Sequence, residues 1–349
     1  MIYFKYTLLI FLVICAIYVA LSKKLINAII IFMSYSIVMS IVWIMLESPD
    51  LAITEAAVGA GVSSILFFVT LKKIKAVDHE EETAEPEDIV EMKKHWEMKL
   101  FSGTFKIGAI FICFGLMVVL LAVVSQLPSF GFASNPEHGE VALKYLQDGM
   151  SETGAVNIVA GMILDYRAFD TFGESCVLFI AATCVTILLR VDTKTSNLSM
   201  PSGQDDRIYE PKNDIILQKT AVLLVPVLIL FGIYVIVNGH LSPGGGFSGG
   251  AIIGAGLILY LNAFGFKKTE EFFTSRTYKI ISCSSLTFYC LAKTYSFYTG
   301  ANHIHSIIGP GTPGNILSAG LILPLNICVG FIVACTMYSF YAFFRKGNF

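Results

Sequence analysis

Residues 215–265 read IILQKTAVLLVPVLILFGIYVIVNGHLSPGGGFSGGAIIGAGLILYLNAFG, two long apolar runs on either side of a short glycine-rich segment. The first run covers residues 215–238 and the second covers residues 247–265. The hydrocarbon core of a bilayer is about 30 Å thick, and about 20 apolar residues of helix cross it. Each run therefore predicts a transmembrane helix, and the segment between them predicts a tight turn.

The composition of the chain extends this prediction to the whole protein. Of its 349 residues 55% are hydrophobic and 14% are charged, and the mean hydropathy is +0.71, outside the usual range of soluble domains. The net charge of −2 and the position of Lys and Arg at the ends of apolar runs argue against nucleic-acid binding. All eight cysteines lie within apolar runs without metal-ligand spacing, so we expect small buried hydrophobic residues and neither a cofactor nor a metal site.

The fold class predicted is an all-α integral membrane protein with about nine transmembrane helices. Lys23 and Lys24 follow the first apolar run, and no Ala-x-Ala cleavage site ends it, so we expect a retained helix and not a signal peptide. Residues 153–166 are a shorter run that predicts a half-length or interfacial helix. The full spans are expected at residues 4–22, 25–45, 50–71, 102–125, 172–190, 215–238, 247–265, 277–298 and 316–344.

Two polar stretches, residues 76–100 and 193–213, are predicted to be cytoplasmic linkers. They divide the chain into a three-helix block (1–75), a two-helix block with the short helix (101–192) and a four-helix domain (214–349). Alternating the spans places most basic residues on one side, which the positive-inside rule identifies as the cytoplasm. We therefore expect an inner-membrane protein whose N-terminus and Gly244 lie outside and whose C-terminus is cytoplasmic. The basic residues on the cytoplasmic side are Lys23, Lys24, Lys72, Lys73, Arg190, Lys194, Lys267, Lys268, Arg345 and Lys346.

The glycine-rich segment, residues 239–250, has two interpretations. Three of its glycines match G-x-G-x-x-G, but a dinucleotide site requires a preceding strand, and here a membrane helix precedes it. In the first interpretation Pro243 ends one helix, the glycines allow a tight turn, and a stripe of glycines packs the next helix closely. In the second, His240 or exposed carbonyl groups take part directly in ion passage. The structural residues proposed are Pro243, Gly244, Gly245, Gly246, Gly249, Gly250 and Gly254.

Two acidic residues lie near the start of the third span. Pro49 and Asp50 suit the first turn of a helix, where the dipole favours a carboxylate. Asp50 is also one of the candidate residues for ion translocation. Glu55 lies inside the apolar run, where a charged group costs about 2.5 to 3.5 kcal/mol on insertion scales. Glu55 is therefore a candidate proton or cation ligand, with a helix–helix hydrogen bond as the alternative.

A second polar group precedes the fifth span. Asp170 and Glu174 are four residues apart and share a helix face, and Asp165 and Arg167 lie just before them. This group could form a hydrated ion entrance or an interfacial set of salt bridges. For Lys293, within a later span, we favour snorkelling to the surface, and the alternative is a buried pairing with an acidic residue.

Three stretches together resemble one set of known subunits. Residues 239–250 (GHLSPGGGFSGG) resemble the signature of the MnhB family of Mrp/Mnh antiporter subunits, and residues 315–331 (NILSAGLILPLNICVGF) are similar to that family's last span. Residues 47–61 (ESPDLAITEAAVGAG) and 156–174 (VNIVAGMILDYRAFDTFGE) resemble successive pieces of the C-terminal extension of the large MnhA-type antiporter protein. In membrane-bound hydrogenases such pieces are typically separate small subunits, so the chain resembles a fusion of them.

The resemblance implies a non-redox membrane subunit that helps to move Na⁺ or H⁺ in a complex with antiporter-like subunits, surrounded by lipid. It also implies kinship of residues 1–190 with a small membrane subunit of respiratory complex I, and hydrogenase or other ferredoxin-linked redox subunits as further partners. Leu241 and Ser242 depart from the antiporter pattern. A purely structural scaffold is the alternative, and a stand-alone transporter is disfavoured because no internal repeat is evident. The residues that match the family's acidic and glycine motifs are Glu55, Asp165, Asp170, Glu174 and His240.

Overall fold

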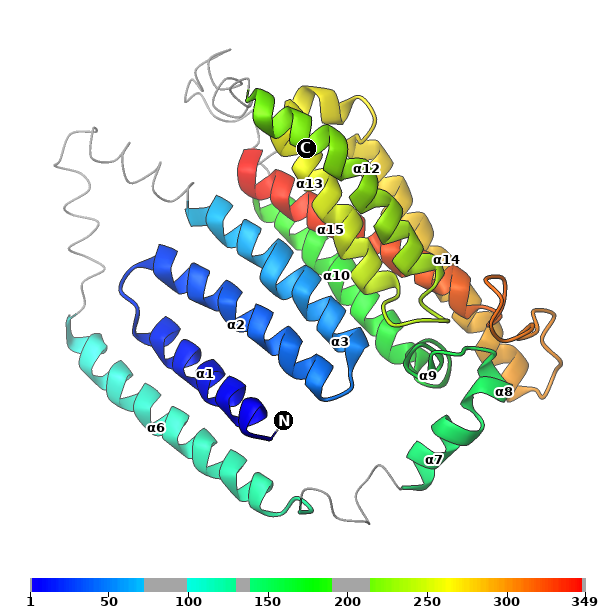
Figure 1. Ribbon diagram of the computed structural model, residues 1–349, viewed down its shortest axis with the longest axis horizontal. Helices are drawn as coiled ribbons and strands as arrows, with labels where there is room; N and C mark the ends of the chain where they lie inside the picture. Colours follow the sequence, from blue (N-terminus) through cyan, green and yellow to red (C-terminus); the bar gives the residue numbers. More distant parts are fainter. Residues whose placement is uncertain (1, 72–98, 130–138, 190–213, 347–349) are drawn as a thin grey trace. The chain divides into compact units, whose positions relative to one another are not determined.

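The computed structural model describes residues 2–71, 99–129, 139–189 and 214–346, and within these ranges the regular elements are all helices. The protein is an all-α integral membrane protein, as the sequence predicts (Figure 1). Its elements are α1 (Ile2–Leu21), α2 (Leu25–Met45), α3 (Pro49–Thr54), η1 (Glu55–Ser63), α6 (Lys99–Ser125), α7 (Glu140–Gln147), α8 (Gly149–Thr153), α9 (Ile158–Gly161), η3 (Met162–Tyr166), α10 (Ala168–Leu189), α12 (Ile215–Val237), α13 (Gly246–Glu270), α14 (Ser275–Ala301) and α15 (Ile322–Lys346).

Eight helices in the described part of the chain are long and apolar enough to cross a membrane. The third of these spans, Pro49–Leu71, contains α3 and η1. The predicted span at residues 277–298, which is not among these eight, corresponds to α14, which has 27 residues and is long enough to cross, at about 1.5 Å per residue. It is less apolar than the others because serine, threonine and lysine interrupt it.

Two predicted helices begin later in the chain than expected. The last helix begins at Ile322 and not at residue 316, because Ala319 (φ 64°) and Gly320 (φ 52°) adopt left-handed conformations that a helix does not contain. The short helix begins at Ile158 and not at residue 153. Residue 153 is instead the last residue of the preceding helix α8, which Gly154 (φ 73°) ends.

Close packing around α13 forms the core of the four-helix domain. Helix α13 contacts α12 on one side and α15 on the other. Of the residues in the most apolar stretch of each helix, 56% are buried in α13 and 78% are buried in α15. Glycines permit this approach, because a Cβ atom on Gly250 would lie 2.5 Å from the carbonyl oxygen of Gly330 on α15. A Cβ atom on Gly249 would lie 2.6 Å from the carbonyl oxygen of Gly232 on α12.

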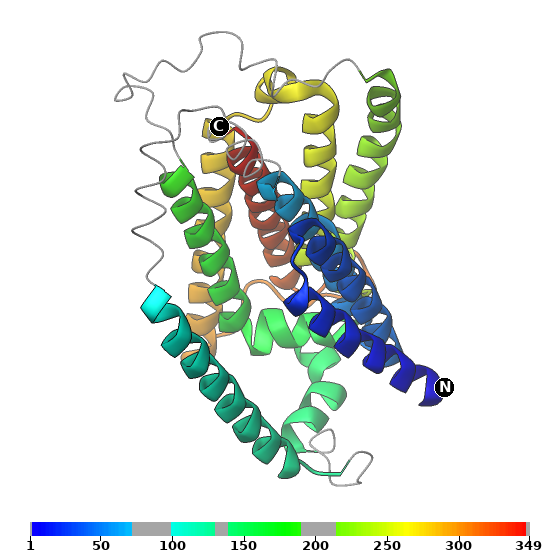
Figure 2. The ribbon, with the colours of Figure 1, turned by 90° about the vertical axis from the view of Figure 1, so that its left-hand side faces the viewer.

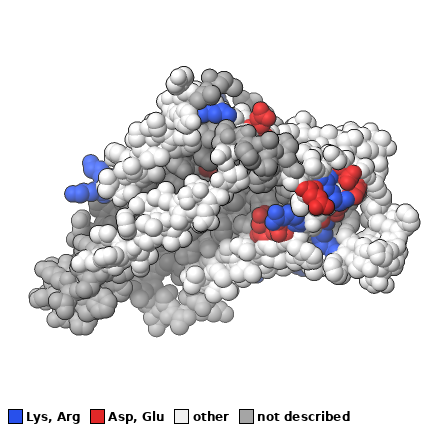
Figure 3. Space-filling model, turned by 90° about the horizontal axis from the view of Figure 1, so that it is seen from below, with Lys and Arg blue, Asp and Glu red and all other residues white. Residues whose placement is uncertain are grey.

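The first three spans run side by side, with α2 in contact with both α1 and η1 (Figures 1 and 2). Helix η1 also contacts α13, and α10 contacts α15, so segments far apart in sequence form one compact unit of residues 1–73 and 146–349. Among the described residues on the face shown in Figure 3, most are neither acidic nor basic, and their charged side chains gather mainly in one region. Such a surface suits contact with lipid.

Residues 74–145 form a second compact unit. It contains α6, whose apolar stretch Ile107–Ser125 has no buried residue. A helix that is hydrophobic on all sides is typical of a membrane span.

Candidate functional site

Asp50 joins the start of α3 to the glycine-rich segment. Its Oδ1 atom accepts a hydrogen bond from the backbone N–H of Gly244, 194 residues away, at 2.9 Å. The same oxygen accepts a second hydrogen bond, at 3.2 Å, from the Nδ2 group of Asn157. Asp50 therefore holds the glycine turn as well as occupying the first turn of its helix.

Asn157 connects three distant segments of the chain. Its Nδ2 group faces Asp50 and also two carbonyl oxygens of the glycine-rich segment, those of Gly239 at 3.2 Å and Ser242 at 3.1 Å. Its Oδ1 atom caps α9 by accepting from the N–H of Val159 at 3.0 Å, and its backbone N–H donates to the carbonyl of His240 at 3.0 Å. The sequence analysis missed this residue. An asparagine before a short apolar helix predicts an N-cap, but not these tertiary partners.

Replacing Asn157 by alanine is expected to lower the thermal stability of the protein. The lost cap costs about 1 kcal/mol, and the carboxylate of Asp50 loses a charge-assisted hydrogen bond worth about 1.5 to 3 kcal/mol. Asn157→Ser is the matched control because serine restores a cap acceptor but not the amide donor. Melting temperatures of the three purified proteins in detergent provide the measurement. Equal stability of Asn157→Ser and the wild type would show that the connection to Asp50 contributes nothing.

The glycine turn is held tightly from both ends. Gly244 (φ 133°) and Gly245 (φ 108°) adopt conformations that other residues rarely adopt. The N–H of Gly246 donates to Oδ1 of Asn326 on α15 at 3.1 Å. His240 is fully buried, and its Nε2 atom lies 3.2 Å from the carbonyl oxygen of Asn315. These contacts fix the backbone of Gly246 and place the ring of His240 inside the protein.

Glu55 is the first residue of the π-helical segment η1, inside the third span. Its side chain is half-buried. A Cβ atom on Gly59 would lie 2.6 Å from Oε1 of Glu55 and 2.8 Å from Oγ of Ser36 on α2. The absence of a side chain at Gly59 therefore gives space to the carboxylate and to a hydroxyl from the neighbouring helix. π-Helical turns are rare and occur frequently at functional sites.

Asp165 lies in the second π-helical segment, η3. Its Oδ1 atom is 3.5 Å from Nζ of Lys293, which comes from α14. The Lys293 side chain is 7% exposed and that of Asp165 is 45% exposed. Our preference for snorkelling at Lys293 is therefore wrong, because a carboxylate from another element compensates the ammonium inside the protein.

Asp170 and Glu174 lie on the exposed surface of α10. Asp170 pairs with Arg167 at 2.7 Å, and both side chains are more than half exposed. The candidate residues therefore form separate groups: Asp50 with the glycine turn, Glu55 with Ser36, Asp165 with Lys293, and Asp170 with Arg167. In the described ranges His, Cys, Asp and Glu form no group of three that could hold a metal ion.

Three sequence families match successive parts of the chain. Residues 10–76 match MbhD, the family of the D subunits of MBH, and residues 112–204 match MbhE, the family of its E subunits. Residues 216–339 match a domain related to the MnhB subunit of Na⁺/H⁺ antiporters. The matches follow one another with no overlap.

Known proteins are similar over long stretches. An uncharacterized protein of Methanocaldococcus jannaschii is 32% identical over 190 residues, which are 50% of this chain and 71% of the relative. A Rhizobium meliloti protein, named as a probable K⁺/H⁺ antiporter A/B subunit, is 27% identical over 250 residues, 67% of this chain and 23% of the relative. In the solved structure of the Mrp complex from Dietzia sp. DQ12-45-1b, one chain superposes with a TM-score of 0.68 at 19% identity. The superposition covers 98% of this chain and 34% of that chain, and it shows a shared fold.

Proposed function

We propose that this chain helps to move Na⁺ or H⁺ as a non-redox subunit of a multisubunit membrane complex. The proposal proceeds from its family, because the chain belongs to the Mrp/Mnh-type antiporter membrane subunits and has parts related to subunits of membrane-bound hydrogenases. The observation that carries the proposal is Glu55, a carboxylate within an apolar span and at the start of a π-helical turn. An ionisable group inside a membrane is expensive and typically functional.

The similar stretches cover 23% of the Rhizobium relative and 34% of the matched Dietzia chain, so this chain spans only part of the length of these proteins. We propose antiporter-like membrane subunits as partners, with lipid around them. Residues 1–75 and 101–192 would correspond to the C-terminal extension of the MnhA-type protein, here called the A-extension part. Residues 214–349 would correspond to the MnhB subunit, here called the B-like domain. Purification of the complex, identification of its subunits and reconstitution in proteoliposomes test the proposal. Antiporter-like subunits are expected, and a chain that transports alone would contradict it.

A structural scaffold is the second candidate. It is favoured by Asn157, which hydrogen-bonds Asp50 and the glycine turn at once, as a joint between three parts would. Under this alternative the chain connects channel-forming subunits, and its acidic residues only form contacts. The two candidates differ in whether transport requires a titratable group at position 55.

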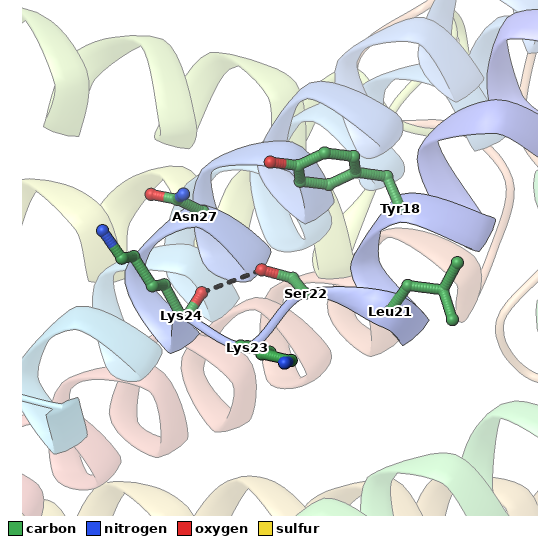
Figure 4. A pocket seen from close by; sticks show the side chains of 6 residues that line it. All are labelled: Tyr18, Leu21, Ser22, Lys23, Lys24 and Asn27. Atoms are coloured by element: carbon green, nitrogen blue, oxygen red, sulfur yellow. Dashed lines mark hydrogen bonds between the residues drawn. The ribbon is translucent and has the colours of Figure 1, made fainter.

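We propose that the turn between α1 and α2 faces the cytoplasm. Figure 4 shows an open hollow at this turn, about 270 Å³ in volume, lined by Lys23, Lys24, Tyr18, Leu21, Ser22 and Asn27. The Oγ atom of Ser22 donates to the carbonyl of Lys24 at 3.1 Å and tightens the turn. Paired lysines next to helix ends favour the cytoplasmic side, and alternation of the spans then places Gly244 outside.

This orientation predicts opposite labelling of two introduced cysteines. In intact cells a membrane-impermeant thiol reagent should modify a cysteine at position 307, where Ile307 is 90% exposed between α14 and α15. A cysteine at position 84 should react only after the membrane is permeabilised. A background in which the native cysteines are replaced serves as the control. Labelling at position 84 in intact cells would show that the chain has the reverse orientation or a different number of spans.

A further inference from the structure

A cavity of about 310 Å³ lies next to Asp165. Its walls come from α8, η3, α14 and the segment that joins α14 to α15. Among the residues that the structure describes, the lining includes two carboxylates, those of Asp165 and Glu152, and no Lys, Arg or His. The lining also includes four residues that carry hydroxyl groups: Thr153, Ser296, Thr299 and Ser306. We refer to this space as the Asp165 cavity.

Lys293 is not among the residues that line the Asp165 cavity. Its ammonium is buried and reaches Asp165 at 3.5 Å, the outer limit of a hydrogen bond. Asp165 is 45% exposed, so its carboxylate is open to solvent on one side and faces Lys293 on the other. A buried ammonium is costly without a counter-charge. Whether the ammonium of Lys293 has a counter-charge therefore depends on whether another cation contacts the carboxylate of Asp165.

We propose that the Asp165 cavity binds a hydrated monovalent cation, which competes with the ammonium of Lys293 for the carboxylate of Asp165. At about 30 Å³ for each water molecule, the cavity has room for roughly ten, enough for an ion with its hydration shell. Its acidic lining attracts a cation, and carboxylate and hydroxyl oxygens are suitable ligands for hard ions. The Thr299 hydroxyl donates to the carbonyls of Tyr295 and Ser296 at 3.1 and 3.0 Å, which leaves its own oxygen free to accept.

This site deepens the proposed function and rests on it. Asp165 belongs to the A-extension part of the chain and Lys293 to the B-like domain, and they are 128 residues apart. A cation that takes the carboxylate releases Lys293 from η3, so occupancy of the cavity changes a contact between the two parts. The distance of 3.5 Å between Nζ of Lys293 and Oδ1 of Asp165 favours replacement of the ammonium by a cation. The attraction between two charges weakens with distance, and a weaker ion pair is displaced more readily.

Charge-selective labelling tests the site in the purified complex, with the native exposed cysteines replaced by serine. A cysteine replaces Ser296, which is partly exposed to the cavity, and reacts with cationic and anionic methanethiosulfonate reagents of similar size. We expect the cationic reagent to react about tenfold faster, because the lining is acidic. Na⁺ or K⁺ should slow that reaction more than choline at the same ionic strength.

Variants separate a cation site from a structural ion pair. Asp165→Asn should remove both the preference for the cationic reagent and the protection by Na⁺ or K⁺. The matched control Asp170→Asn, a carboxylate outside the cavity, should leave both unchanged. Lys293→Gln should lower the cation concentration for half-protection by about tenfold, a typical coupling between competing ligands, whereas Lys293→Arg should resemble the wild type.

The proposal is overturned if choline protects as well as Na⁺ and K⁺, or if protection survives Asp165→Asn. Either result would identify the Asp165–Lys293 pair as a structural contact only. Should Lys293→Gln fail to assemble, the measurements with Lys293 present still decide the question. Labelling requires no transport, so normal transport by Glu55→Gln with intact cation protection would refute the relay and leave the cation site standing.

Discussion

Replacing Glu55 by glutamine is expected to lower ion-coupled transport strongly and to leave the complex assembled. The carboxylate lies in the span Pro49–Leu71, next to the hydroxyl of Ser36. Glutamine has nearly the same size and keeps hydrogen-bonding capacity, but it cannot exchange a proton. If Glu55 relays protons or binds the cation through its charge, coupled transport should fall by at least about tenfold, a modest contribution for a group in proton transfer.

The measurement is cation-coupled proton movement by purified complex in proteoliposomes, with subunit content determined on the same samples. Glu55→Asp should retain part of the activity because it keeps a titratable carboxyl. Glu47→Gln is the matched control, since Glu47 is exposed at the turn between α2 and α3, outside the span. Wild-type transport by Glu55→Gln would exclude an obligatory relay and favour the scaffold.

The sequence predicts the membrane spans well because the bilayer acts on each span separately. An apolar run of about 20 residues must become a helix in lipid, whatever its neighbours are. The predicted run at 25–45 is α2, residue for residue. The same reasoning placed the start of the last helix six residues too early, because it weighed only apolarity and not the backbone of Ala319 and Gly320.

The sites depend on contacts between distant segments, and a single sequence does not contain them. Asp50 was assigned to its own helix start and to the ion-translocation candidates, whereas its partners lie 107 and 194 residues away. Lys293 was expected to reach the surface, with a buried pairing to an acidic residue as the alternative. Its partner Asp165 comes from another part of the chain. The free-energy cost of a charged group in a membrane identified the acidic residues as candidates, but it did not predict which residues each of them contacts.

Replacing Gly250 by leucine is expected to prevent stable assembly of the protein, with transport lost as a consequence. A Cβ atom at this position would lie 2.5 Å from the carbonyl oxygen of Gly330 and 2.8 Å from Cβ of Val333 on α15. Two of the three nearest atoms are backbone, so rotation of a side chain would not relieve the overlap. Overpacking a core by a few methylene groups costs about 1 to 3 kcal/mol, and leucine adds a whole side chain between two helices.

A matched pair of alanine variants separates this packing from the general effect of removing a glycine. Gly256 lies on the same helix, but a Cβ atom there would be 3.5 Å from its nearest neighbours, an ordinary contact. Gly256→Ala should therefore assemble normally, and it gains up to about 1 kcal/mol of helix propensity, whereas Gly250→Ala should lower the yield and melting temperature. Size-exclusion chromatography and thermal unfolding in detergent compare the variants. If Gly250→Leu assembled normally and lost only cation transport, the residue would belong to the ion path and not to the contact between α13 and α15.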